Sequence, residues 1–283
     1  MRPDFLAIGH IPKDLTPDGF QLGGAVTYGA IAAKRLGLSP AVVTSVGPDV
    51  PNIKIAESLP DIPVHVVASA QTTTFVNTYV SGRRTQFLRA VAGPVSASDI
   101  PQEWKDAPLV MLGPLAQELD ADLAGHFPES IVVASIQGWL RQWDQEGRVS
   151  PCHWTGNDVL PWVDAAILSM DDIGDETMLD GWKEMTPVLI FTRGAEGSDV
   201  HYEGAWHHVD PFPVAEVDPT GAGDVFAAAY IVRYRETHDV LLSARFASCA
   251  ASFCVAHIGT EGIPYRAEVE ARLAGADARR GRL

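Results

Sequence analysis

Residues 218–224 read Asp-Pro-Thr-Gly-Ala-Gly-Asp and run directly into the apolar stretch 225–230. The small residues Gly221, Ala222 and Gly223 allow a tight turn, and the alanine-rich run that follows is typical of a helix. The backbone N–H groups of the turn would then lie at a helix N-terminus, where unpaired donors and the helix dipole attract anions. The sequence therefore predicts an anion site at residues 221–223.

Asp224 adds a carboxylate to this predicted anion site. A negative side chain beside a bound phosphate is unfavourable unless it has a chemical task, and taking a proton from an attacking hydroxyl is such a task. The alternative is that Asp224 only caps the helix. The motif by itself leaves both interpretations open.

The composition excludes several classes of function. The chain has 283 residues, 46% of them hydrophobic and 20% charged, and a formal net charge of −15. Such a charge argues against binding to nucleic acid or to an anionic membrane. The three cysteines have no CxxC spacing, and no signal peptide or membrane-length apolar run is present. We expect a cytoplasmic protein.

Strand and helix patterns alternate along the chain, which predicts an α/β fold with a mainly parallel sheet and helices on both faces. Ligands of such sheets bind at the carboxyl ends of the strands. The expected strands cover 5–8, 41–46, 64–68, 109–112, 131–134, 165–168 and 188–191, with a hairpin at 200–209. The expected helices cover 25–37, 221–234, 240–257 and 266–274, with further helices between several of the strands.

A second hairpin, at 73–88, interrupts the βα alternation, with Ser81-Gly82 as its turn. It predicts a small β lid on one domain that spans 1–283. The residues from His10 to Leu22 are expected to form a short loop. An exposed lid edge could pair with a second subunit, which would give a homodimer.

The chain resembles the ribokinase-like (PfkB-type) family of small-molecule kinases at two separated motifs. One is the stretch at 218–224, close to the family's Asp-Thr-x-Gly-Ala-Gly-Asp. The other is a Gly-Gly pair leading a helix that ends in Leu-Gly, here Gly23-Gly24 through Leu36-Gly37. The elements between them follow the family order, so the resemblance covers nearly the whole chain and implies the three-layer ribokinase-like fold.

The resemblance implies a role for several residues around the transferred phosphate. Asp224 would be the catalytic base, and the amides of 221–223 would stabilise the phosphoryl group. ATP would contact the stretch after a strand that matches Thr-x-Gly-x-x-Gly, namely Thr192, Arg193, Gly194 and Gly197. The segment 248–262 would border the adenine, and Asp218 would neighbour a monovalent cation such as K⁺.

The resemblance also implies an acceptor site and a Mg²⁺ site, with two departures from the family. Asp14 and the Gly23-Gly24 backbone would bind a small-molecule hydroxyl acceptor, but Tyr28 stands where the family commonly has Asn. The family's metal motif Asn-x-x-Glu appears here as Ser169-Met-Asp-Asp172. Asp172 can still orient water on Mg²⁺, since a carboxylate oxygen is a hard ligand.

Two further stretches resemble the inositol-kinase-like branch of the family: Leu112-Gly-Pro-Leu115, with Glu118 nearby, and Ile136-Gln-Gly-Trp-Leu-Arg141. Gln137 could bond a polyol, and Arg141 could neutralise phosphate. A Gln-Gly turn and a solvated arginine are equally commonplace, so both interpretations stay open.

The expected function is ATP-dependent phosphorylation of a hydroxyl on a small polyol or sugar, with an inositol-like acceptor favoured. One alternative is a nucleoside kinase of the same family, since Tyr28 could stack on a base. Another is a non-catalytic sensor that keeps the fold, which the altered 169–172 stretch would allow. A dehydrogenase is disfavoured, because its dinucleotide-binding motif, GxGxxG after the first strand, is absent from the sequence.

Overall fold

The computed structural model describes residues 2–80 and 83–280, and the predicted Ser81-Gly82 turn lies outside these residues. In the described chain, nine strands form one sheet in the order β15-β14-β13-β12-β9-β8-β1-β4-β5. All pair in parallel except β14 and β15, which form the hairpin at one edge. The strands are β1 (Phe5–Ile8), β4 (Pro40–Val46), β5 (Val64–Ala68), β8 (Leu109–Leu112), β9 (Ile131–Ser135), β12 (Ala165–Ser169), β13 (Val188–Thr192), β14 (Ser198–Tyr202) and β15 (Ala205–Val209).

The central strands are apolar because helices or loops cover both of their sides. All four residues of β1 are buried, as are all four of β8. Ile8, the last residue of β1, pairs with Leu112, the last residue of β8, so these two strands end level with each other. The segments that follow β1, β8, β9, β12 and β13 therefore meet at one edge of the sheet.

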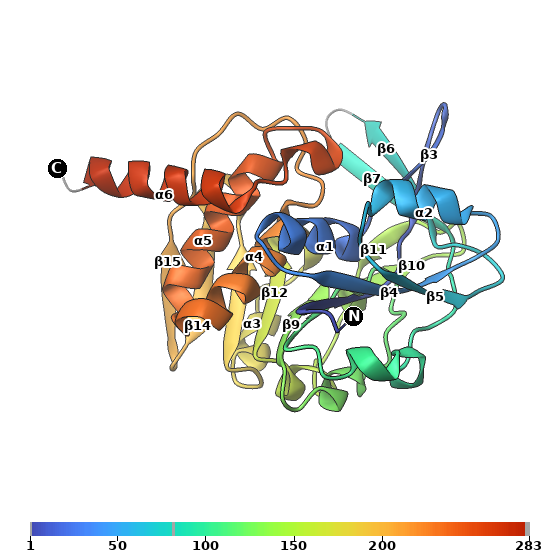
Figure 1. Ribbon diagram of the computed structural model, residues 1–283, viewed down its shortest axis with the longest axis horizontal. Coiled ribbons are helices and arrows are strands. Elements are labelled where there is room, and N and C mark those ends of the chain that lie inside the picture. The colour runs from blue at the N-terminus through green and yellow to red at the C-terminus, as the bar shows by residue number, and fades with distance from the viewer. Residues whose placement is uncertain (1, 81–82, 281–283) are drawn as a thin grey trace.

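One face of the sheet is covered by long helices, as Figure 1 shows. Residues 225–232 of α4 are buried along their whole length, and α4 packs against α1 and α5. Gly29 permits the close approach of α1, since a Cβ atom there would lie 2.6 Å from the sulfur of Met111. The helices of this side are α1 (Ala25–Arg35), α2 (Asn52–Ser58), α4 (Ala222–Thr237), α5 (Val240–Cys254) and α6 (Arg266–Arg280).

The opposite face differs from the prediction of further helices between the strands. It is covered by short 3₁₀ turns and by the one-turn helix α3 (Met178–Trp182). Trp104, Phe127, Trp139 and Trp182 fill this side of the core. Prolines and glycines are frequent in these connections, and both disfavour helix interiors. The α/β ribokinase-like fold class is nevertheless confirmed.

The lid is larger than the sequence predicts. A second sheet joins β3 (Gly19–Leu22), β2 (Lys13–Thr16), β6 (Thr74–Val80) and β7 (Arg83–Ala90), in that order. The expectation of a loop over 10–22 was therefore wrong, because this segment pairs with a strand more than fifty residues away. A small hairpin of β10 (Arg141–Trp143) and β11 (Val149–Pro151) lies nearby.

Across residues 2–80 and 83–280, none of the helices is both long enough and apolar enough to span a lipid bilayer.

Candidate active site

The turn before α4 has the geometry of an anion site. Gly221 adopts the left-handed conformation, with φ of 79°, and α4 begins at the next residue. The N–H of Ala222 donates to the Pro219 carbonyl at 3.2 Å. Within the described residues, the N–H groups of Gly221, Gly223 and Asp224 donate to no protein acceptor. The turn therefore offers backbone donors at the positive end of α4.

Asp218 and Cys254 hold this turn in place from behind. The two carboxylate oxygens of Asp218 accept hydrogen bonds from the Thr220 N–H at 3.0 Å and the Gly259 N–H at 3.3 Å. The buried thiol of Cys254 donates to the Thr220 carbonyl at 3.6 Å. Asp218 thus fastens the turn to the segment after α5. That Asp218 also neighbours a monovalent cation stays a prediction.

Asp224 is half-buried in the first turn of α4. Burial and, to a smaller extent, the nearby charge of Asp172 raise the pKa of its carboxyl to about 7, while Arg141 opposes the shift. A carboxyl with a pKa near neutrality can take and release a proton under ordinary conditions. This property suits Asp224 to general-base chemistry.

Asp172 follows strand β12 and is buried. One of its carboxylate oxygens accepts hydrogen bonds from the N–H and hydroxyl of Ser169, both at 2.8 Å. The other accepts a hydrogen bond from the Gln137 side chain at 2.6 Å. Gln137 is therefore bonded to an acid rather than open to a polyol, and its predicted role in binding the acceptor stays a prediction.

A carboxylate has about four lone-pair sites, so Asp172 keeps capacity for a further donor such as a metal-bound water. Mg²⁺ commonly uses one or two carboxylates together with water and substrate phosphates. Asp172 fits this pattern of indirect binding. No cluster of three or more His, Cys, Asp or Glu side chains suited to hold a metal by itself occurs among the residues described.

The lid brings Asp14 toward the same edge of the sheet. The Asn77 amide, on β6, donates to the Asp14 carboxylate at 3.1 Å, and the Gln86 amide, on β7, donates to Asn77 at 3.1 Å. A Cβ atom on Gly23 would lie 3.1 Å from Asp14 Oδ2, so these two predicted residues are adjacent. Asn77 and Gln86 are not among the predicted site residues, because only the pairing of β2 with β6 brings them near Asp14.

The predicted donor loop follows strand β13. The Thr192 hydroxyl donates to the Leu168 carbonyl at 3.2 Å, and Gly194 and Gly197 have φ of 55° and 94°. The Arg193 side chain donates to Asp199 at 2.6 Å and to Glu176 at 3.1 Å. Arg193 therefore ties the loop to its neighbours, which makes it a scaffold for the loop in this structure.

Glu118, named in the predicted motif after β8, has a structural role. Its buried carboxylate accepts hydrogen bonds from the N–H groups of His10, Leu115 and Ala116 at 2.7 to 3.0 Å. His10 in turn contacts the Thr73 hydroxyl at 2.7 Å. This buried network joins the end of β1, the loop after β8 and the base of the lid. Arg141 lies near the same loop, with one guanidinium nitrogen 3.3 Å from the Leu115 carbonyl.

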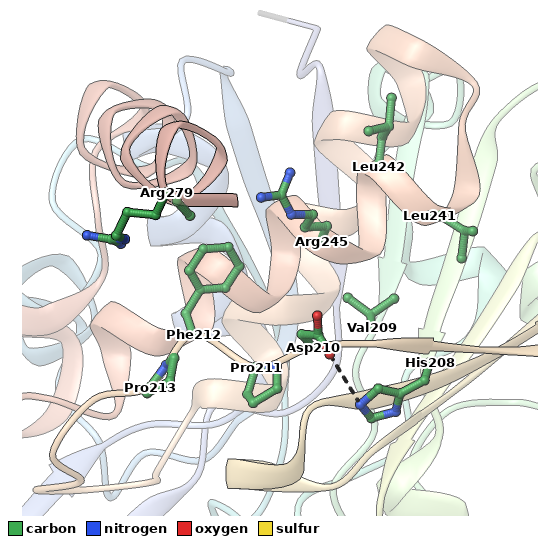
Figure 2. Close-up of a pocket in the computed structure, with 11 residues that line it drawn as sticks. His208, Val209, Asp210, Pro211, Phe212, Pro213, Leu241, Leu242, Arg245 and Arg279 are labelled. Atoms are coloured by element: carbon green, nitrogen blue, oxygen red, sulfur yellow. Dashed lines mark ion pairs between the residues drawn. The ribbon is translucent and has the colours of Figure 1, made fainter. Parts of the chain in front are cut away.

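A cavity of about 400 Å³ lies beside the segment that leads to the turn. The strand end and loop at 208–213, helix α5 and the C-terminal part of α6 surround it, as Figure 2 shows. Phe212, Pro211, Leu241 and Leu242 give it an apolar wall, and Arg245 lies with its guanidinium carbon 6.0 Å from the centre of the Phe212 ring.

Comparisons with known proteins agree with these motifs. The profile of the pfkB family carbohydrate kinases matches residues 172–266. A ribokinase of Bacillus subtilis is 43% identical over 88 residues, which cover 30% of this chain and 29% of that protein. A cytidine kinase of Thermococcus kodakarensis is 25% identical over 260 residues, covering 82% of this chain and 88% of that one.

A solved structure supports the fold over nearly the whole chain. It is a pyrophosphate-dependent kinase in the ribokinase family, complexed with a pyrophosphate analogue and myo-inositol. The TM-score is 0.76 at 23% sequence identity, and the alignment covers 94% of this chain and 99% of that one. In both of its motifs, its fold and the profile match over 172–266, the chain is similar to the PfkB (ribokinase-like) family of carbohydrate kinases.

Proposed function

We propose that this protein transfers the terminal phosphoryl group of ATP to a hydroxyl of a small polyol or sugar. The observation that carries the proposal is Asp224, a half-buried carboxyl of raised pKa beside the open amides of the turn before α4. A pure binding site for phosphate would gain nothing from such an acid. A kinase gains a base for the attacking hydroxyl.

The chain's own residues then divide the reaction between them. Asp224 takes the proton from the acceptor oxygen as that oxygen attacks the terminal phosphorus, and the bond to the leaving phosphate breaks. The open N–H groups of Gly221, Gly223 and Asp224 stabilise charge on the transferred group. Mg²⁺, when bound, neutralises charge on the donor phosphates, and Asp172 would orient a water of its shell.

The cavity beside Phe212 supports a nucleotide donor over pyrophosphate. A nucleotide needs an apolar slot for its base near the phosphate site, and pyrophosphate does not. The loop that lines the cavity ends at Pro213, five residues before the first residue of the turn, Asp218. Arg245 of the cavity lies one helical turn before Ser248, where the segment expected to border the adenine begins. Pyrophosphate is the second candidate donor, because a structurally similar kinase is pyrophosphate-dependent.

The lid supports a polyhydroxylated acceptor. Asp14, Asn77 and Gln86 form a row of hydrogen-bonding side chains across three lid strands. Such a row can bond several hydroxyl groups of one ligand. Nucleosides are the alternative acceptors, favoured by the similarity to a cytidine kinase. Against them, the Tyr28 ring is buried and packs on Gly221, so it is not open for a base to stack on.

The test is acceptor-dependent ADP release from ATP and Mg²⁺ over a panel of inositols, sugars and nucleosides, with pyrophosphate as a second donor. We expect Asp224→Asn to lower turnover on the best acceptor by about 10²–10⁴, the usual contribution of a general base. Nucleotide binding and thermal stability should be retained.

The matched control is Asp239→Asn, which makes the same change at the N-cap of α5, where Asn also caps well. This variant should keep wild-type turnover. Equal turnover in the wild type and Asp224→Asn would refute the role of the base. ATP binding without transfer to any acceptor would favour the sensor alternative.

A further inference from the structure

Tyr28, in the first turns of α1, lies directly behind the anion turn. It is 6% exposed, and a Cβ atom on Gly221 would lie 2.1 Å from its ring atom Cδ1 and 2.2 Å from Cε1. The ring edge therefore occupies the space that any side chain at position 221 would need. Gly221 is required here both by its φ of 79° and by this contact.

The helix that carries Tyr28 begins where the lid ends. Strand β3 stops at Leu22, and the N–H of Tyr28 donates to the Gly24 carbonyl at 3.2 Å. The Thr27 hydroxyl donates to the Gly23 carbonyl at 2.6 Å, which fastens the same turn. Tyr28 is thus placed by the junction between lid and helix, while its ring contacts the turn on the far side.

The electrostatic environment places the phenol among the acids of both substrate sites. Burial raises the pKa of Tyr28, and the charges of Asp218, Asp224 and Asp14 raise it further. These acids come from the anion turn, from α4 and from the lid. The hydroxyl therefore stays protonated, and the side chain is uncharged.

We propose that Tyr28 is a positioning residue: its ring supports Gly221 and thereby aims the amides of the turn at the transferred phosphoryl group. This inference rests on the proposed function. Carbon atoms of the ring edge, and not the hydroxyl, make the contact with Gly221. The hydroxyl is therefore dispensable for this support. Turn geometry matters because a displacement of about 1 Å in a catalytic group can cost about 10²-fold in rate.

The first experiment measures steady-state kinetics and, by calorimetry, the binding of pyrophosphate and ATP to Tyr28→Phe and Tyr28→Ala. We expect Tyr28→Phe to stay within about threefold of wild type in kcat. Tyr28→Ala should lose about 10–10²-fold in kcat and bind both anions more weakly, with a smaller change in acceptor KM.

Tyr230→Ala is the matched control. Tyr230 is also fully buried and lies on α4, within the core and away from the turn. Its replacement should lower the melting temperature at least as much as Tyr28→Ala, yet leave kcat and anion affinity within about threefold. An equal loss of kcat in both alanine variants would reduce Tyr28 to a packing residue and overturn the inference.

A second experiment keeps the inference testable if Tyr28→Ala folds poorly. Gly221→Ala introduces the methyl group that would meet the ring, so it should weaken pyrophosphate binding more when Tyr28 is present than in the Tyr28→Ala background. Additive effects of the two substitutions would contradict the proposed contact.

Failure of the proposed function gives a different result. Anion binding needs neither acceptor nor transfer. A wild-type protein that binds pyrophosphate in a Tyr28-dependent way but phosphorylates nothing would refute the kinase assignment and keep the positioning role. A wild type that binds neither anion would refute both.

Discussion

At the scale of single residues, the site depends on acids that have different surroundings. Asp224 is half-buried beside another negative charge, and the pKa of its carboxyl rises to about 7. Asp172 is more deeply buried, but three hydrogen-bond donors satisfy its oxygens. Asp218 accepts backbone hydrogen bonds that shape the turn. Similar carboxyl groups can therefore serve as base, metal-water ligand and scaffold.

The pH dependence of the reaction should report Asp224. The base works only when deprotonated, so kcat/KM should rise as pH increases through about 7. Asp172→Asn removes a charge that raises this pKa, so the rise should move to lower pH. Arg141→Gln removes a charge that lowers it, so the rise should move to higher pH. Both are measured as kcat/KM profiles between pH 5 and 9.

Asp171→Asn is the control for these profiles, since Asp171 is the exposed neighbour of Asp172. Its profile should match that of the wild type. Shifts in the same direction for Asp172→Asn and Arg141→Gln would contradict the assignment of the titrating group to Asp224.

At the scale of elements, the predicted site residues lie in turns at the ends of strands and helices, and the loop between β13 and β14 is an example. The donor loop leaves β13 and returns as β14, and Gly197 makes the return at φ of 94°. A Cβ atom at this position would lie 2.3 Å from the Val209 carbonyl oxygen. The loop therefore has one close backbone contact that no other residue type tolerates.

Gly197→Ala should lower the free energy of unfolding by about 2–4 kcal/mol, because strain and a backbone clash add together. It should also weaken ATP binding. Gly204→Ala is the control, since Gly204 has φ of 76° but open space around it. It should cost only about 1–2 kcal/mol, the usual penalty of the left-handed conformation. Urea unfolding and calorimetry measure both effects, and equal costs would refute the clash.

At the scale of the whole molecule, the proposed active site lies between two sheets. The main sheet carries the predicted donor loop, Asp172 and, through α4, the proposed base, while the lid sheet carries Asp14 and Asn77. The buried hydrogen bonds of Glu118 and His10 join the two at the base of the lid. The affinity for the acceptor should therefore depend on the lid sheet, and the rate of phosphoryl transfer should depend on the main sheet and its helices.

Asn77→Ala removes the hydrogen bond that holds the Asp14 carboxylate, the proposed acceptor ligand. It should raise the acceptor KM by about tenfold with a much smaller change in kcat, because a hydrogen bond to a charged group contributes about 1.5–3 kcal/mol. Thr78→Ala is the control at the next position on β6, where the exposed side chain donates to the Thr85 carbonyl of the lid hairpin. Steady-state kinetics with varied acceptor measure the effect. A fall in kcat at constant KM would place Asn77 with the catalytic groups instead.

Sequence alone was sufficient for the fold class and for the glycine turn at the start of α4. The apolar strands, the Gly-Gly helix start and the stretch at 218–224 are local patterns, and local patterns determine local structure. The same reasoning failed at residues 10–22, where strands 13–16 and 19–22 form only through pairing with the distant strand 74–80. It also failed at the short turns of the second face, where tryptophans fill the space that helices were expected to fill.

The sequence by itself predicted which residues would carry the chemistry: Asp224 with its glycine turn, Asp172, and Asp14. Only the tertiary structure decided how they work together. Packing buried Asp224 near Asp172, turned Gln137 toward Asp172 and set the ring of Tyr28 against Gly221. The physical reason is that turns and helix starts depend on neighbours in sequence, whereas burial, charge coupling and side-chain contact depend on segments brought together only by folding.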